Sequence, residues 1–222
     1  MFTMRGFEWD LLEEVFAPVY SPSTEVGLDF LEQRRVPFGG SLLEVGCGAG
    51  LLAVLAAKYG CRRVVASDVN PHAVRNAALN AARHGVADRV EAVHCDMFSG
   101  IDHDERFDTI FWSSNYVYGP CDYEYRSLHE RAYVDAGYRA HRAFLEQAPL
   151  WLSEGGTALL HFSSRGDHGE LENLARRTGR LLRTVTTVEL LESEYGADPV
   201  RHLLLEVLPV SDRVGGEMAT AR

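Results

Sequence analysis

From about residue 41 onward, the sequence alternates between short apolar runs typical of strands and patterns typical of helices. The strand-like runs span residues 41–46, 62–67, 89–94, 107–112 and 157–162, with two further candidates near 181–190 and 201–208. Helical patterns lie between most of these runs, at residues 51–59, 71–84, 133–152 and 169–179. Because strands and helices alternate, the sequence predicts an α/β fold with a mainly parallel sheet.

Residues 1–40 lie outside this alternation. They contain one amphipathic helical pattern and the proline-containing bend APVYSPSTEV. The whole chain has 222 residues, a length that suits one domain with a full core. We therefore expect a single domain over residues 1–222, in which an N-terminal helical cap at 1–40 covers an α/β core at 41–210.

Composition and charge exclude several classes of partner. Lys and Arg number 22 against 32 Asp and Glu, so the net charge is −10. An acidic chain repels phosphate backbones, and nucleic acid is not expected as a substrate. The cysteines form no CxxC pair and the Asp and His residues lack ligand spacing, so no metal site is expected. With no signal-peptide pattern and no membrane-length apolar run, we expect a cytoplasmic protein without membrane contact.

A glycine loop, Gly46-Cys47-Gly48-Ala49-Gly50, follows the first strand-like run and precedes a helical pattern. Glycines at alternate positions let the backbone turn tightly and approach a ligand closely. Asp68 ends the next strand, 22 residues past Gly46. In nucleotide-binding α/β folds a carboxylate at this place meets ribose hydroxyls. The combination predicts a site for a nucleoside-containing ligand.

Two further acids indicate which ligand this is. Glu44 lies two residues before the first glycine, where a carboxylate would repel a pyrophosphate but attract an ammonium group. This fits S-adenosylmethionine (SAM), whose methionine end carries an amine and whose sulfur is cationic. Asp96 follows the third strand, where it could accept a hydrogen bond from the adenine amino group. The predicted SAM-binding residues are Glu44, Gly46, Cys47, Gly48, Gly50, Asp68, Asn70, Asp96, Met97 and Ser113.

The segments LLEVGCGAG, VVASDVN and HCDMF resemble the SAM-binding motifs of class I SAM-dependent methyltransferases. The resemblance covers about residues 40–210. It implies a Rossmann-like fold with helices on both faces of a seven-stranded mixed sheet, in the order 3-2-1-4-5-7-6. Strand seven would be antiparallel. Ligands would then bind at the carboxyl ends of strands one and four, where the strand order reverses.

The segment FDTIFWSSNY (107–116) resembles the pattern FDLIVSNPPY, which ends strand four in HemK/PrmC-like methyltransferases. Residues 19–31 and 133–156 also resemble that subgroup. Its Asn side chain and a Pro carbonyl grip a planar nitrogen. Here Ser113, Ser114 and Asn115 stand in place of Asn-Pro-Pro, and Tyr116 matches. On this fold the altered segment would face the sulfonium of SAM.

The altered segment favours methyl transfer to a small molecule, in which catalysis is mostly positioning. The predicted catalytic residues are Ser113, Asn115 and Tyr116, and the predicted acceptor-binding residues are Tyr20, Tyr116, Tyr118 and Tyr138. The Tyr-rich loop 113–131 would cover the acceptor pocket. If the acceptor carries a proton, the candidates to take it are His129, His141 and His161.

The sequence leaves three alternatives open, of which one is a SAM-binding regulatory or scaffold protein without turnover. An enzyme could act on SAM alone, cleaving or cyclising its aminobutyrate arm to give methylthioadenosine and azetidine-2-carboxylate. A protein methyltransferase would instead modify Gln, Lys or an N-terminus.

Overall fold

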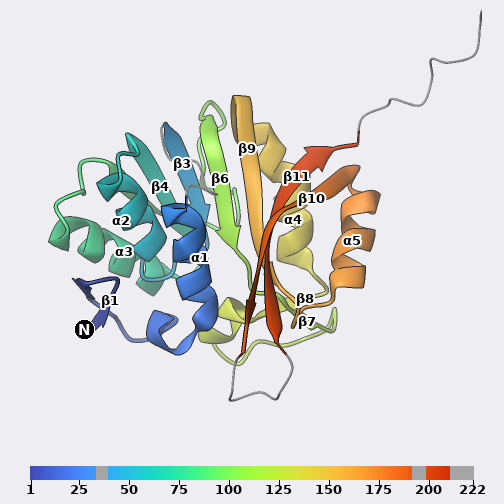
Figure 1. Cartoon of the computed structure of the whole chain (residues 1–222), viewed down its shortest axis with the longest axis horizontal. Helices are drawn as coiled ribbons and strands as arrows, with labels where there is room; N and C mark the ends of the chain where they lie inside the picture. Colours follow the sequence, from blue (N-terminus) through green and yellow to red (C-terminus); the bar gives the residue numbers. More distant parts are fainter. Residues whose placement is uncertain (34–39, 192–198, 211–222) are drawn as a thin grey trace, which may run out of the picture.

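A seven-stranded mixed sheet forms the centre of the molecule (Figure 1). The computed structural model describes residues 1–33, 40–191 and 199–210. The strands of the sheet are β3 (Ser41–Val45), β4 (Arg63–Asp68), β5 (Val90–His94), β6 (Phe107–Ser113), β9 (Leu152–Ser163), β10 (Arg180–Leu190) and β11 (Val200–Pro209). Their order is β10-β11-β9-β6-β3-β4-β5, and β11 is antiparallel to both of its neighbours. The order predicted from the family resemblance is confirmed.

Helices cover both faces of the sheet. They are α1 (Pro22–Glu32), α2 (Leu51–Lys58), α3 (Pro71–Arg83), α4 (Arg139–Gln147) and α5 (His168–Arg177), with short 3-10 turns at Pro18–Tyr20, His129–Ala132 and Ala148–Trp151. Apolar residues of α1, α2 and α3 belong to one buried cluster, and those of α4 and α5 belong to a second. The first three helices therefore pack on one face of the sheet and the last two on the other (Figure 1). Among the described residues, no helix has the length and apolar character that crossing a bilayer requires.

The N-terminal cap contains more than the predicted helix. Strands β1 (Phe2–Met4) and β2 (Phe7–Trp9) form an antiparallel hairpin before α1. The turn places Gly6 at φ 73°, a conformation that glycine adopts without strain. Trp9 is fully buried and its indole nitrogen donates to the carbonyl oxygen of Met4 at 3.1 Å, which closes the hairpin.

The helix predicted over residues 133–152 is wrong at its start. Residues Val134–Ala136 form β8, which pairs in parallel with β7 (Val117–Gly119). The carboxylate of Asp135 then accepts hydrogen bonds from the backbone nitrogens of Ala140 and His141 at 3.1 and 3.0 Å. These bonds satisfy free N–H groups at the start of α4, so the helix begins only at Arg139. The strand forms because a distant segment pairs with it, which local sequence does not reveal.

Two buried asparagines on α3 hold the segment that follows the N-terminal hairpin. The amide of Asn80 accepts from the nitrogen of Asp10 at 2.8 Å and donates to the carbonyl oxygens of Asp10 and Ala49 at 3.1 and 2.8 Å. Asn76 accepts from the nitrogen of Leu12 at 2.8 Å and donates to Asp10 at 2.9 Å. Because Ala49 belongs to the glycine loop, Asn80 joins the cap and that loop to one helix.

We expect Asn80→Ala to lower the free energy of unfolding by about 2–4 kcal/mol, because it leaves buried backbone groups without partners. Urea denaturation measures this change. Asn173→Ala, at an exposed position of α5, is the matched control and should change stability by less than about 0.5 kcal/mol. A loss for Asn80→Ala no larger than that of the control would contradict the role given to Asn80.

Candidate functional site

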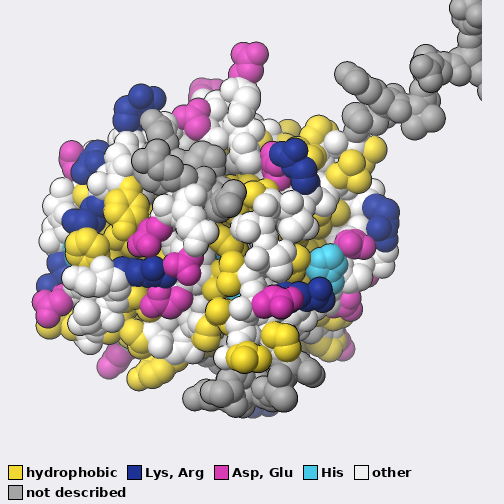
Figure 2. All heavy atoms as spheres, viewed as in Figure 1, with side chains coloured by type: hydrophobic (Ala, Val, Ile, Leu, Met, Phe, Trp, Pro, Cys, Tyr) yellow, Lys and Arg dark blue, Asp and Glu magenta, His cyan; other side chains and the backbone are white. Residues whose placement is uncertain are grey.

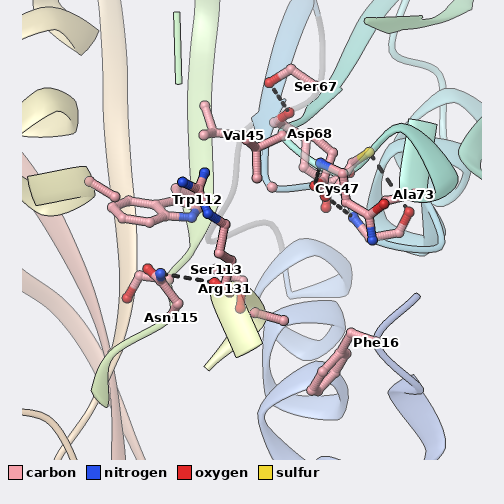
Figure 3. A pocket seen from close by; sticks show the side chains of 18 of the residues that line it. Phe16, Val45, Cys47, Ser67, Asp68, Ala73, Trp112, Ser113, Asn115 and Arg131 are labelled. Atoms are coloured by element: carbon pink, nitrogen blue, oxygen red, sulfur yellow. Dashed lines mark hydrogen bonds between the residues drawn. The ribbon is translucent and has the colours of Figure 1, made fainter. Parts of the chain in front are cut away.

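A cavity of about 620 Å³ lies at the carboxyl ends of β3, β4 and β6. Its volume is within the range of sites that bind small organic ligands, roughly 300–1,000 Å³. Figure 3 shows Cys47, Asp68 and Ala73 on one side of it, and Trp112, Ser113 and Asn115 on the other. The cavity therefore joins the predicted SAM-binding segments to the altered segment after β6.

The glycine loop uses its glycines for two different purposes. Gly46, Gly48 and Gly50 all have positive φ, at 65°, 54° and 79°. Gly46 and Gly48 line the cavity. Gly50 is not among the lining residues, and a Cβ there would come within 2.7 Å of the Cα of Ala77 on α3. The structure thus gives Gly50 a packing role between the loop and α3 in place of the predicted ligand contact.

Asp68 ties the glycine loop to the start of α3. Its carboxylate accepts from the backbone nitrogens of Gly48 at 2.9 Å and Asn70 at 2.8 Å. Asn70 in turn caps α3 by accepting from the nitrogen of His72 at 2.9 Å, and it donates to the carbonyl oxygen of Glu14 at 2.7 Å. Burial raises the pKa of Asp68. The carboxylate is fixed by two donors and retains lone pairs for a ligand hydroxyl.

Glu44 is a buried acid in the wall of the cavity. Only 5% of the residue is exposed, and one carboxylate oxygen accepts from the nitrogen of Ala53, in the first turn of α2, at 2.9 Å. Burial, with a smaller contribution from the negative charge of Asp68, raises the pKa of Glu44 to about 8. The carboxyl is therefore mostly protonated at neutral pH, and a cation beside it would favour release of that proton.

The remaining predicted SAM-binding residues also line the cavity. These are Cys47, Asn70, Asp96, Met97 and Ser113. Asp96 lies 3.7 Å from the guanidinium of Arg131, which belongs to the loop on the opposite side. This ion pair closes one edge of the cavity between the β5 end and that loop.

Ser113, Asn115 and Tyr116 line the half of the cavity beyond the glycine loop. The amide nitrogen of Asn115 donates to the carbonyl oxygens of Arg131 and Val134 at 3.0 and 3.1 Å. Its oxygen is buried without a hydrogen-bond partner. The amide nitrogen of Asn115 therefore holds the covering loop, and its amide oxygen remains available to accept a hydrogen bond from a ligand.

Three of the predicted acceptor-binding tyrosines lie outside the lining of the cavity. Tyr20 is 86% exposed, and neither it nor Tyr118 or Tyr138 is among the residues that line the cavity. Tyr138 is fully buried; its hydroxyl donates to the carbonyl oxygen of Tyr116 at 2.7 Å and accepts from the nitrogen of Asp167 at 2.8 Å. The ring of Tyr118 packs edge-on against that of Tyr138. Tyr138 positions the backbone of Tyr116 and does not face a ligand.

Other aromatic and charged residues line the cavity in their place. Tyr125, His129 and Arg131 come from the loop that was expected to cover the pocket. Tyr133 and Phe16 pack edge-on at 5.3 Å, so the N-terminal cap meets the loop at the cavity. The Tyr-rich composition of the loop predicts that it contributes residues to the cavity, whereas no sequence pattern predicts that Phe16 lines it.

The histidines proposed to take a proton differ in their access to the cavity. His129 lines it. His141 is buried and lies 2.8 Å from the carboxylate of Asp135. His161 lies directly behind Ser113, with its Nδ1 at 3.1 Å from the hydroxyl oxygen. Burial lowers the pKa of both His141 and His161, the latter to about 3, so neither is a strong base. Among the described residues, no group of three His, Cys, Asp or Glu side chains could hold a metal ion.

Part of the chain is similar to known methyltransferases. A family model described as ribosomal protein L11 methyltransferase (PrmA) matches residues 20–113. The ribosomal protein L11 methyltransferase of Pelotomaculum thermopropionicum is 44% identical over 103 residues, 44% of this chain and 33% of the relative. That of Burkholderia multivorans is 44% identical over 63 residues, 28% of this chain and 21% of the relative. The chain thus spans about a third or less of the length of these curated relatives.

Solved structures share the fold at low identity. The ribosomal protein L11 methylase of Lactobacillus delbrueckii subsp. bulgaricus aligns with a TM-score of 0.55 at 18% identity, over 83% of this chain and 77% of that one. A SAM-dependent methyltransferase of Geobacter sulfurreducens, solved with S-adenosyl-L-homocysteine, aligns with a TM-score of 0.55 at 16% identity, over 85% and 91%. The fold predicted for this chain, that of class I SAM-dependent methyltransferases, is confirmed.

The comparisons also correct the predicted acceptor. The family model that matches residues 20–113 and the curated relatives are all named for a protein substrate, ribosomal protein L11. The expectation of a small-molecule acceptor, or of SAM as the sole substrate, is therefore wrong.

The raised pKa of Glu44 predicts a pH effect on the stability of the ligand-free protein. The folded state binds a proton at Glu44 up to about pH 8, whereas the same carboxyl in the unfolded chain, with its ordinary pKa of 4.5, has lost it. This contribution to stability is full below about pH 4.5 and is lost as the pH rises through 8. Glu44→Gln removes the titration, so it should raise the melting temperature relative to wild type more at pH 9 than at pH 5. Glu154→Gln, at an exposed position, is the control, and a pH-independent effect of Glu44→Gln would contradict the prediction.

Proposed function

We propose that this protein is a SAM-dependent methyltransferase whose acceptor is a protein. One observation carries the proposal: the segment similar to L11 methyltransferases, residues 20–113, contributes the glycine loop, Glu44, Asp68 and Ser113, and these meet at one cavity. The bound SAM would supply a methyl group on a cationic sulfur. The protein would bind and orient the two reactants and exclude water.

The residues around the glycine loop fit the parts of SAM. Asp68, held by two backbone donors, has lone pairs left to accept from ribose hydroxyls. Glu44 is buried with its pKa raised to about 8, and the methionine ammonium would pair with its ionised form. Asp96 and Met97 would contact the adenine. These assignments follow the sequence prediction.

The other half of the cavity suits an acceptor presented by a protein. The segment between β6 and α4 contributes Tyr125, Arg131 and Tyr133 to the lining of the cavity, and the N-terminal cap contributes Phe16. The matched relatives are named for a ribosomal protein, which supports a protein acceptor for this chain and a cytoplasmic location. Acidic side chains are interspersed with basic ones on the face shown in Figure 2, and the net charge of −10 favours a basic partner.

The acceptor group is best proposed as an amine, of Lys or of an N-terminus. The Asn-Pro-Pro-Tyr pattern that grips a planar amide in HemK/PrmC-like enzymes is altered here to Ser113-Ser114-Asn115-Tyr116. The amide nitrogen of Asn115 is bonded to the backbone at Arg131 and Val134, which leaves its oxygen to accept from an amine N–H. The finer resemblance to the HemK/PrmC subgroup stays a prediction, as do the catalytic roles of Asn115 and Tyr116.

Transfer of isotopically labelled methyl from SAM tests the proposal. The protein is incubated with labelled SAM and either ribosomal protein L11 or the total proteins of the large ribosomal subunit, which are then separated. The proposal expects label in a protein band, together with formation of S-adenosylhomocysteine. Label found exclusively in small molecules, or none at all, would overturn it.

Replacing Asp68 should affect SAM binding directly. Asp68→Asn removes the charge but keeps an acceptor oxygen for the backbone donors, so we expect SAM affinity to fall about 10–100-fold. Titration calorimetry measures the affinity. Asp88→Asn, at an exposed position after α3, should leave it unchanged. Equal affinity of Asp68→Asn and wild type would exclude Asp68 from the site.

A further inference from the structure

Three polar side chains form a buried line that ends at the cavity. Ser113, His161 and His202 lie on the neighbouring strands β6, β9 and β11. The hydroxyl oxygen of Ser113 is 3.1 Å from Nδ1 of His161, and Nε2 of His161 is 3.1 Å from Nδ1 of His202. His161 and His202 are 2% and 1% exposed, whereas Ser113 lines the cavity. The line therefore leads from the core to the cavity wall.

The surroundings of His161 keep its ring uncharged. The ring of Phe30, on α1, packs edge-on against His161 at 5.2 Å and helps to seal it from solvent. Burial, and then the neighbouring His202, lowers the pKa of His161 to about 3. A charged imidazole here would also repel a cationic ligand in the cavity. His161 consequently acts as a neutral ring, with one nitrogen that donates and one that accepts.

A neutral ring between two partners allows two directions of hydrogen bonding. In the first, the Ser113 hydroxyl donates to Nδ1 of His161, whose Nε2–H donates to Nδ1 of His202. In the second, all donors are reversed, and the Ser113 hydroxyl proton is free to point into the cavity. The first direction turns the oxygen lone pairs of Ser113 toward the cavity, and the second turns a partial positive charge toward it.

We propose that the His161–His202 pair holds the Ser113 hydroxyl proton, so that the Ser113 oxygen presents its lone pairs to the sulfonium of SAM. The inference rests on the proposed function, because the cation that selects this direction is the sulfonium. A positive charge in the cavity stabilises the direction with the lone pairs facing it and disfavours the other. His161 and His202 are then positioning residues that act through Ser113.

This arrangement discriminates the substrate from its product. SAM carries a positive sulfur, whereas S-adenosylhomocysteine is a neutral thioether of nearly the same shape. An oriented oxygen next to the sulfur therefore favours SAM and adds little to the binding of the product. The His161–His202 pair therefore contributes to the release of S-adenosylhomocysteine as well as to the binding of SAM.

Binding of the two ligands to single and double variants tests the inference. Ser113→Ala should weaken SAM binding about 5–10-fold and change S-adenosylhomocysteine binding by less than about twofold. His161→Phe should do the same, and the double variant should lose no more than either single variant, because His161 acts through Ser113. Ser113→Thr, which keeps the hydroxyl, should restore the preference. Ser163→Ala is the control, since this buried serine on β9 bonds to the nitrogen of Arg165 and is not a lining residue.

The outcomes separate this inference from the proposed function. If wild type binds SAM but Ser113→Ala weakens both ligands equally, or if the effects of the two substitutions add, the inference is overturned and the methyltransferase proposal stands. If wild type binds no SAM, the proposed function fails and the inference fails with it. Nitrogen-15 spectra of the SAM-bound wild type give a variant-free test, independent of any folding defect. They should show Nδ1 of His161 unprotonated, and a protonated Nδ1 would contradict the inference.

Discussion

The hydrogen bonds to the carboxylate of Asp68 hold the ligand-binding half of the molecule together. They connect the glycine loop after β3 to the end of β4 and the start of α3. Asn70 and Asn80 extend this connection to Glu14, Asp10 and the glycine loop, so the N-terminal cap is bound to the same helix. One acid at a strand end thereby sets the positions of the loop, the helix and the cap around the cavity.

The half of the site that lies on regular structure was largely predictable. The strands of the core are short apolar runs, the glycine loop and Asp68 are local signals, and the strand order places them together. The other half depends on contacts between distant segments. Residues 134–136 read as helix but pair with β7, and Tyr138 reads as a pocket residue but is buried by bonds to Tyr116 and Asp167. Such pairings are tertiary, and local pattern cannot show them.

Residues 113–115, where the buried strand β6 ends, are polar. They are tolerated there because each polar group has a hydrogen-bond partner or faces the cavity. Ser113 bonds to His161, the hydroxyl of Ser114 donates to the backbone of His161, and the amide nitrogen of Asn115 holds the covering loop. These contacts have two consequences for the site. They fix the backbone and leave two oxygens, on Ser113 and Asn115, as possible acceptors.

Proton release on SAM binding tests whether Glu44 and Asp68 form a SAM site. Titration calorimetry at pH 7 in two buffers of different ionisation enthalpy gives the number of protons exchanged. We expect SAM to bind with release of close to one proton, because Glu44 has a pKa of about 8 in the empty site and pairs with the ammonium when ionised. We also expect Glu44→Gln to bind SAM more weakly and to release no proton. Absence of SAM binding, or binding without proton release in the wild type, would contradict a SAM site at Glu44 and Asp68.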